Sequence, residues 1–441
     1  MRDICDGFHP LNVWGFGGIF RHVSTPEPTP RTRRGRKPKD AISVEELQGF
    51  KFFKRLRGLF DSLHGCAAHR NRKLFYDEYA MALLFYFLNP ALNALRGLQL
   101  ATEFEKVQKT LGLRRMSLGS MSESVRVFDP ALLEAVFADL AAKAAERTVD
   151  PRLKDLRQVL TVVDGTILPA LPRMAWAVWL RDTDRGAKAH VQFEVLKGVP
   201  VSVEITPGHR SEIAALRATL KAGRLYVTDR GYRSFDLMQA MLDADSSFVS
   251  RLHANVVSET LEERALTEEA RQANVVSDRV VRVGGKLSAG KLRRPVRLVE
   301  VRVPAKPPRG LGYPVKKVSS KKLYREERGK SYTLILCTDC LDLPADVVAL
   351  IYQHRWKVEL FFRLLKGVFG VCHLLSDSYE GVSIQVYAAL IATLVLAEYT
   401  GIAASKKTYL LVTLYLQGWT TLEELQRELE RMKEQAASKN V

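Results

Sequence analysis

Two short runs of apolar and β-branched residues constrain the fold most, because each of them stops at an aspartate. Val159–Val163 is followed by Asp164-Gly165-Thr166, and Arg224–Thr228 is followed by Asp229-Arg230-Gly231. Such runs are typical of buried strands. Helical patterns such as Glu212–Ala222 alternate with them, which indicates an α/β sheet with a parallel part. Sheets of this kind place ligands at the carboxyl ends of their strands, so we expect the two aspartates to share one edge.

Positive charge is the second strong constraint. Lys and Arg number 67 against 49 Asp and Glu, a net charge of +18. This balance favours a polyanionic partner, and double-stranded DNA is the first candidate. Residues 279–330 alone hold 17 Lys and Arg against three acids. An excess so one-sided is typical of a surface that binds phosphates.

The patterning divides the chain into segments. Residues near the N-terminus are rich in Gly and Pro, the next hundred have helical periodicity, and the strand-rich core is interrupted by short strands with Gly-, Pro- and Lys-rich turns. The predicted segments are a flexible basic arm (1–40), a helical DNA-binding domain (41–150), the first part of the α/β core (151–254), a basic antiparallel β-rich insertion (255–335), the second part of the core (336–400) and a helical C-terminal tail (401–441).

Within the helical domain, apolar residues recur at spacings of three and four over Tyr76–Leu88, Leu92–Leu111 and Pro130–Arg147. Asp129 is the expected N-cap of the last of these helices, because a proline follows it. Ser117–Ser124 fits the turn of a helix-turn-helix DNA reader and fits equally well an ordinary connection between two helices.

The arm ends in a basic cluster, Arg31–Lys39. It is similar to the Arg-Gly-Arg-Pro core of AT-hook peptides, in which arginines lie in the minor groove of DNA. Arg34 and Arg36 would make those contacts, although Lys37 interrupts the core. A basic linker with only non-specific affinity for phosphates explains the same residues.

Five cysteines are too few, and odd in number, for a secreted disulfide framework, and no signal-peptide pattern opens the chain. We therefore expect a cytoplasmic protein. Ile384–Ala404 is apolar and about long enough to cross a membrane, but it contains Gln385 and Glu398. A buried core helix is the better interpretation, so we expect no membrane association.

A single helix is predicted over Ala345–Phe369, after a strand at Tyr332–Thr338. At about 100° per residue, six of its side chains fall within roughly a third of the circumference. These are Tyr352, Arg355, Trp356, Glu359, Arg363 and Lys366. Apolar residues cover the opposite arc, which would anchor the helix on the sheet. A solvated face with i,i+4 ion pairs explains the charges but not the two aromatic residues.

Asp164, Asp229 and Glu359 together form the set of carboxylates that a two-metal phosphoryl-transfer site requires. Hard oxygen ligands can hold two divalent cations about 4 Å apart, one activating a water or 3′-hydroxyl and the other stabilising the leaving oxygen. Tyr352, Arg355 and Lys366 would then contact the flanking phosphates. The pattern by itself leaves structural carboxylates as an equal alternative.

These motifs resemble those of a known family. Asp164-Gly165-Thr166, Asp229-Arg230-Gly231-Tyr232 and Tyr352-x2-Arg355-x3-Glu359-x6-Lys366 are similar to motifs of the DDE transposases of bacterial insertion sequences. The last motif resembles the signature of the Tyr-Arg-Glu-Lys group, the insertion sequence four-like family. The resemblance spans roughly residues 159–396.

The resemblance implies a ribonuclease-H-like catalytic core in which Asp164, Asp229 and Glu359 bind Mg²⁺, for which Mn²⁺ can substitute. It also implies cleavage at transposon ends, transfer of the freed 3′-hydroxyl to target DNA, a homodimer that pairs two ends, and association with the bacterial nucleoid. Some relatives stack a flipped base on an aromatic residue. Trp356 is a candidate for that role or, equally, a core-lining residue.

Two alternatives use the same motifs. One is a transposase-derived DNA-binding protein without catalysis, against which the three intact carboxylates argue, and the other is a nuclease of the same fold that cuts but does not join.

At the C-terminal end, Thr420-x2-Glu423 predicts a capping box. The helix that it opens would either dock on the body of the protein or dimerise through its leucines.

Overall fold

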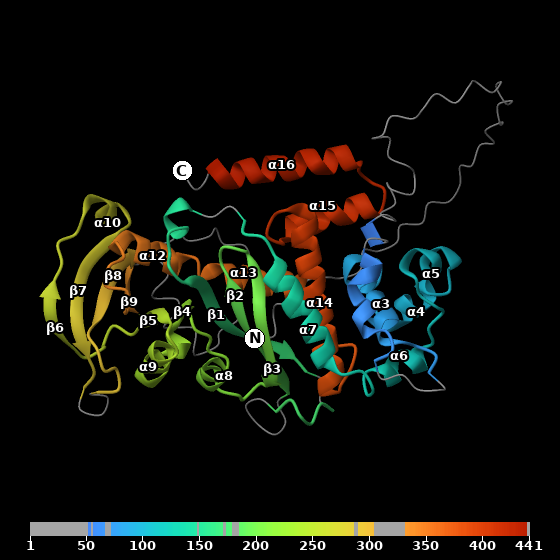
Figure 1. Cartoon of the computed structure of the whole chain (residues 1–441), viewed down its shortest axis with the longest axis horizontal. Coiled ribbons are helices and arrows are strands. Elements are labelled where there is room, and N and C mark those ends of the chain that lie inside the picture. Colours follow the sequence, from blue (N-terminus) through green and yellow to red (C-terminus); the bar gives the residue numbers. More distant parts are fainter. Residues whose placement is uncertain are drawn as a thin grey trace, which may run out of the picture. The chain divides into compact units, whose positions relative to one another are not determined.

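The computed structural model describes residues 52–53, 56–66, 72–147, 150–170, 173–178, 185–285, 290–303 and 331–438. Within these residues one mixed sheet contains nine strands (Figure 1). In chain order they are β1 (Val159–Pro169), β2 (Gly186–Glu194), β3 (Val199–Pro207), β4 (Arg224–Thr228), β5 (Ser247–Leu252), β6 (Ser258–Glu263), β7 (Val275–Val283), β8 (Val296–Val303) and β9 (Tyr332–Thr338).

The strand order is β3-β2-β1-β4-β5-β9-β8-β7-β6. Strands β1, β4 and β5 are parallel neighbours, whereas every other pairing in the sheet is antiparallel. The prediction of an α/β sheet with a parallel part is therefore confirmed. The strands of the basic insertion continue this sheet, because β9 pairs with β5 on one side and with β8 on the other.

Strand β1 is longer than the sequence predicts. Its parallel pairing with β4 stops at Val162, but its antiparallel pairing with β2 continues from Asp164, opposite Val191, to Pro169. The expected end of this strand at Asp164 is therefore wrong. An apolar run marks only the part of a strand that is buried on both faces, so it does not reveal a continuation along a hairpin partner.

Helices surround the sheet and form the N-terminal part of the described chain. They are η1 (Arg57–Leu63), α3 (Tyr76–Leu88), α4 (Leu95–Ala101), α5 (Glu105–Leu111), α6 (Leu118–Ser124), α7 (Pro130–Lys143), η2 (Pro151–Leu153), α8 (Glu212–Ala218), η3 (Arg230–Tyr232), α9 (Phe235–Asp243), α10 (Glu268–Gln272), α12 (Ala345–Gln353), α13 (Trp356–Gly367), α14 (Tyr379–Thr400), α15 (Lys406–Leu416) and α16 (Leu422–Ser438).

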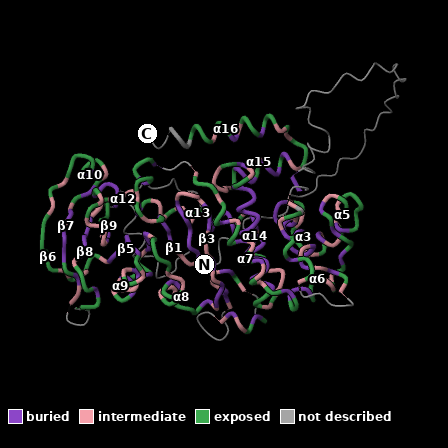
Figure 2. The backbone as a smooth tube through the Cα atoms, viewed as in Figure 1, coloured by how far each residue is buried: buried purple, intermediate pink, exposed green. Residues whose placement is uncertain are grey.

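Helix α14 lies at the centre of the main hydrophobic core. It is long and apolar enough to cross a membrane, but 94% of its most apolar window is buried inside the protein, as its purple trace in Figure 2 shows. It packs against α3, α7 and β3. The segment is thus the buried core helix that its sequence favours.

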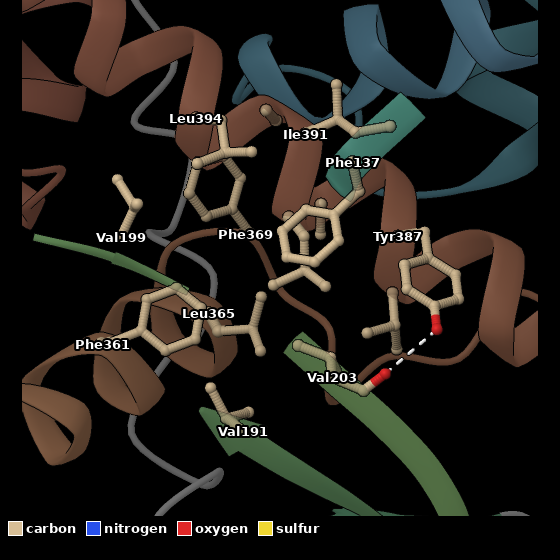
Figure 3. Close-up of a cluster of buried hydrophobic side chains, with 14 of the residues drawn as sticks. Phe137, Val191, Val199, Val203, Phe361, Leu365, Phe369, Tyr387, Ile391 and Leu394 are labelled. Atoms are coloured by element: carbon tan, nitrogen blue, oxygen red, sulfur yellow. Dashed lines mark hydrogen bonds between the residues drawn. The ribbon is translucent and has the colours of Figure 1, made fainter. Parts of the chain in front are cut away.

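Figure 3 shows how this core joins helices to the sheet. Phe137 of α7 faces Tyr387 of α14 with ring centroids 6.1 Å apart. The Tyr387 hydroxyl donates a hydrogen bond of 3.0 Å to the carbonyl oxygen of Val203 in β3. Phe361 and Leu365 bring α13 to the same cluster. The N-terminal helices and the sheet therefore share buried side chains.

Two predictions in the helical N-terminal region are wrong in detail. The helix predicted over Leu92–Leu111 is interrupted between α4 and α5. At the break, the Thr102 hydroxyl donates to the Gln99 carbonyl and accepts from the Met116 amide, so buried polar bonds hold the chain out of helical continuation. Ser117 caps α6 through the Ser120 amide. The segment that could have been a helix-turn-helix turn is therefore itself a helix.

The helix predicted over Ala345–Phe369 is two helices, α12 and α13. Backbone hydrogen bonds between residues three apart, including Arg355 N to the Tyr352 oxygen at 3.0 Å, form a tighter turn at the junction. His354 and Arg355 keep right-handed helical dihedral angles. Since neither Gly nor Pro marks the junction, hydrophobic periodicity passes through it unchanged.

Helix α16 begins one residue later than its predicted capping box. Thr421 and Glu424 bond reciprocally, with the Thr421 amide donating to the Glu424 carboxylate at 2.9 Å and the Glu424 amide donating to the Thr421 hydroxyl at 3.1 Å. Leu425 and Leu429 are buried against Tyr415 of α15. The helix thus docks on the body of the protein.

Candidate active site

The two aspartates predicted as site residues lie at the carboxyl end of the parallel strand pair β1 and β4. Asp164 is two residues beyond the last parallel pair, and its Oδ1 accepts a hydrogen bond of 2.8 Å from the Gly165 amide. Asp229 directly follows β4 and caps η3, with its Oδ1 accepting from the Gly231 amide at 2.7 Å. Local backbone bonds therefore fix both carboxylates at one edge of the sheet.

The environment of Asp164 disfavours its charged form. Burial raises its pKa to about 7, and the negative charge of Asp229 acts in the same direction. The Gly165 amide and Arg355 oppose the shift only in part. The negative charge of Asp229 thus acts on a carboxylate that is mostly buried, and this is a situation that a bound cation relieves.

Arg355 connects Asp164 to the third predicted carboxylate. Its guanidinium forms an ion pair with Glu359 one turn along α13, and it lies 3.6 Å from the Asp164 carboxylate. All three side chains are mostly shielded from solvent. The junction between α12 and α13 thus places one cation between a strand carboxylate and a helix carboxylate.

The remaining predicted residues lie around this core. Tyr352 is buried, and Arg251 of β5 interacts with it. Trp356 is 45% exposed, so the interpretation of it as a core-lining residue is wrong. Arg363 covers its ring, with the guanidinium carbon 5.3 Å from the ring centroid. Lys366 lies in the last turn of α13.

A groove runs from these residues towards the antiparallel part of the sheet. It has a volume of about 690 Å³, and Tyr352, Arg355 and Trp356 are among the residues that line it. Arg302 of β8 and Tyr332 of β9 line it as well. The groove therefore combines cations with aromatic faces beside the carboxylates. Arg34 and Arg36, the two arginines expected in the minor groove, lie outside the described residues.

The structure changes the interpretation of the basic stretch at residues 279–330. Seven of its Lys and Arg residues lie in the described part of the chain, and six of these form ion pairs with acids. The pairs are Arg279–Glu300, Arg282–Glu259, Lys291–Asp236, Arg293–Asp243, Arg294–Asp339 and Arg297–Asp278. Most of these acids lie outside the stretch, so a count along the sequence overstates the free charge of its described residues.

One acidic residue of the site is absent from the sequence prediction. Glu212, the first residue of α8, contributes negative charge to the surroundings of Asp164, and its Oε1 lies 3.4 Å from the Lys188 ammonium of β2. A local motif cannot find it, because β1, β2 and α8 meet only through the fold. The one signal in the sequence is the pair of glycines, Gly165 and Gly231, that follow the two aspartates.

Comparison with known proteins identifies the family of this chain. Residues 155–395, more than half of the chain, match the family described as the transposase DDE domain. The chain belongs to this family. The matched range contains Asp164, Asp229 and Glu359 together with the sheet that positions them.

Relatives of this DDE-domain chain carry transposase names. A Sinorhizobium fredii protein named as a transposase is 25% identical over 260 residues, 58% of this chain and 65% of that protein. A Geobacillus stearothermophilus protein named as the transposase of insertion sequence element IS5377 is 23% identical over 316 residues, 71% of this chain and 74% of that protein. The chain thus spans slightly under two thirds of the first of these relatives.

A cryo-EM structure of a piggyBac transposase synaptic complex with hairpin DNA covers 88% of this chain and 83% of its own, at 10% identity. Its TM-score of 0.37 is too low to establish a shared fold.

DDE transposases use divalent metal ions, and the donor set of this DDE-domain chain fits such ions chemically. Its candidate ligands are carboxylates, the oxygen donors that Mg²⁺ prefers. Among the described residues, no group of three or more acidic, His or Cys side chains is arranged to hold a metal. In this structure Glu359 instead forms an ion pair with Arg355. Glu359 would have to exchange that partner in order to join Asp164 and Asp229.

Proposed function

We propose that this chain is an insertion-sequence transposase of the Tyr-Arg-Glu-Lys group. It binds the ends of its element, hydrolyses the DNA there and joins the 3′-hydroxyl ends to target DNA. The proposal rests on one arrangement: Asp164 and Asp229 both lie just beyond the parallel pairing of β1 with β4, and Arg355 links Asp164 to Glu359. Strands β1 to β5, with the helices that flank them, would form a ribonuclease-H-like core.

In this proposal Asp164, Asp229 and Glu359 hold two divalent cations, Mg²⁺ or Mn²⁺. When bound, these cations activate the attacking water or 3′-hydroxyl and stabilise the leaving oxygen. The protein contributes rigid placement of two of the carboxylates, since backbone amides hold Asp164 and Asp229. The raised pKa of Asp164 makes its carboxylate a group that gains from a nearby positive charge.

Arg355 has two successive roles in the proposal. Without DNA it neutralises Glu359 and contacts Asp164. A guanidinium released from Glu359 would bind a phosphate next to the scissile bond, because its planar two-pronged donor fits a phosphate well. Tyr352 and Trp356 would hold flanking nucleotides in the groove, and Arg363 and Lys366, further along α13, would hold phosphates next to them. Arg34 and Arg36 would add contacts to double-stranded DNA.

A synaptic complex needs two element ends, and we propose that a homodimer supplies them. The net charge of the chain, +18, favours association with DNA in the bacterial cytoplasm and the nucleoid.

The test uses the purified full chain, labelled DNA with the ends that flank its gene, Mg²⁺ and a target plasmid. We expect metal-dependent 3′-end cleavage and joined products. Asp164→Ala, Asp229→Ala and Glu359→Ala should each lower the cleavage rate by at least about 1,000-fold, because each removes a ligand whose loss leaves the transition-state charge unscreened. DNA affinity should stay within a few fold of the wild type.

Asp243→Ala is the matched control, because Asp243 lies on the surface of α9 in an exposed ion pair with Arg293. It should cleave at the wild-type rate. Cleavage without joined products would instead identify a nuclease. Tight binding without cleavage in the wild type would favour a DNA-binding protein that has lost catalysis. Full activity of any one of the three carboxylate variants would remove that residue from the site.

A further inference from the structure

We propose that Glu212 is a positioning residue that fixes the spacing between the segments carrying Asp164 and Asp229. The inference rests on the proposed function, in which these two aspartates hold divalent cations. Glu212 is not itself one of the proposed ligands, and its Oε1 lies 3.4 Å from the Lys188 ammonium.

The first observation is that two glycines leave room for the Glu212 carboxylate. A Cβ atom built on Gly165 would lie 2.8 Å from the Glu212 Oε1, and one built on Gly231 would lie 3.2 Å from the Oε2. Neither glycine has a positive φ, so neither is required by backbone conformation. The absence of a side chain at each glycine leaves room for the Glu212 carboxylate. Its Oε1 lies next to Gly165 and its Oε2 lies next to Gly231.

The second observation is that Lys188 fastens this carboxylate to the sheet. Its side chain is 14% exposed, and its ammonium also donates to the Arg210 carbonyl oxygen at 3.3 Å. Lys188 therefore ties β2 to the segment that leads into α8. A shielded ion pair of this kind restricts the Glu212 side chain more than a solvated pair would.

The third observation is a buried donor beside Glu212. Tyr232 of η3 is 1% exposed, and its hydroxyl has no hydrogen-bond partner among the described residues. Tyr232 and Glu212 line the same small cavity. Burial raises the pKa of the Tyr232 hydroxyl, and the negative charges of Glu212, Asp164 and Asp229 all act in the same direction. A buried polar group without a partner is costly, so a shift that brought the Glu212 carboxylate within hydrogen-bond distance of this hydroxyl would be favourable.

Together these contacts make four elements converge on one side chain. Strand β1 meets it through Gly165, β2 through Lys188 and η3 through Gly231, while α8 supplies the residue itself. Asp164 precedes one of these glycines, and Asp229 lies two residues before the other. Movement of the Glu212 carboxylate would therefore change the separation of the two proposed ligands.

The first experiment measures Mn²⁺ binding to the full chain by electron paramagnetic resonance, without DNA. Groups that orient metal ligands typically contribute 10- to 100-fold to metal affinity. We therefore expect Glu212→Ala to weaken Mn²⁺ binding by about tenfold or more, and Glu212→Gln, which retains the shape, to weaken it less. Glu194→Gln is the matched control, because Glu194 is a shielded glutamate of β2 paired with Lys197 at 3.7 Å. It should bind Mn²⁺ like the wild type.

The second experiment uses the glycines. Gly165→Ala should weaken Mn²⁺ binding by displacing the Glu212 carboxylate, but it should add little further loss once Glu212→Ala has emptied that space. If Glu212→Ala does not fold, Glu212→Asp, which keeps the charge but withdraws it by one methylene, replaces it in both experiments.

Unchanged Mn²⁺ affinity in the Glu212 variants would overturn the inference, as would independent, multiplicative losses from Gly165→Ala and Glu212→Ala. Asp164→Ala tests the proposed function separately, since it should abolish the site. If Asp164→Ala binds Mn²⁺ as the wild type does, the metal-binding role itself fails, whatever the Glu212 variants show.

Discussion

A buried histidine behind the carboxylate edge makes the stability of this protein depend on pH. His190 of β2 is buried, its Nε2 lies 2.9 Å from the Thr206 hydroxyl, and its Nδ1 has no partner among the described residues. Burial lowers its pKa to about 4, and the charges of Lys188 and Arg210 act in the same direction. The folded protein therefore keeps this imidazole neutral where an unfolded chain would protonate it.

The expected consequence is a loss of stability in mild acid. Between about pH 6.5 and pH 4 the unfolded chain binds more protons at His190 than the folded chain does, so the free energy of unfolding falls as the pH is lowered. From pH 7.5 to pH 5 this residue should contribute a loss of about 2 kcal/mol. Urea unfolding of the wild type and His190→Gln at both pH values measures it. The exposed His373→Gln serves as control, and an equal pH dependence in His190→Gln and the wild type would contradict the prediction.

At the scale of single elements, helix starts are encoded locally and can be tested locally. The Asp129 side chain accepts a hydrogen bond of 2.9 Å from the Ala131 amide at the start of α7. Asp129→Ala should lower the free energy of unfolding by about 1 kcal/mol, whereas Asp129→Asn should retain most of it, because an amide oxygen also caps a helix. Thermal or urea unfolding distinguishes the two variants. Equal losses in both would show that the carboxylate charge, and not the cap, stabilises α7.

The contrast between Asp129 and the junction of α12 and α13 shows what sequence patterns can predict. Two adjacent residues, Asp129 and Pro130, are enough to predict the cap, and apolar runs predict the strands of the core. No residue type identifies the junction at His354. Its hydrogen bonds join residues three apart, and they use right-handed helical dihedral angles that any residue adopts. Hydrophobic periodicity therefore predicted the common face of Tyr352, Arg355 and Glu359 but not the break within it.

The candidate site was predictable to the same extent. Asp164, Asp229 and Glu359 follow from strand ends and a spaced motif, whereas Glu212 depends on contacts between β1, β2, α8 and η3 that are distant in sequence. The charge of residues 279–330 is a further case, because most acidic partners of its described cations lie elsewhere in the chain, as Asp339 does for Arg294. Long-range ion pairs are invisible to a count along the sequence.

At the scale of the whole molecule, the hydrophobic core includes residues that lie outside the range matched by the family. The transposase DDE domain covers residues 155–395, yet the main core also contains buried residues of α3 and α7, such as Phe137. Helix α14 belongs to the matched range and packs against both of those helices and β3. The N-terminal helices should therefore unfold together with the sheet. Both pack on α14, so the loss of either one exposes apolar surface of α14 that the other also helps to bury.

Hydrogen exchange under native conditions tests this coupling. Phe137→Leu leaves a small gap against Tyr387 and should cost roughly 1 kcal/mol, which corresponds to about a fivefold faster exchange for amides that open only by global unfolding. We expect the same factor for the slowest amides of α3 and for Val162 in β1. Phe104→Leu, at a position that is 58% exposed, should change neither. Faster exchange confined to α3 and α7 would show instead that the N-terminal helices open as an independent unit, and that α14 is held by the sheet alone.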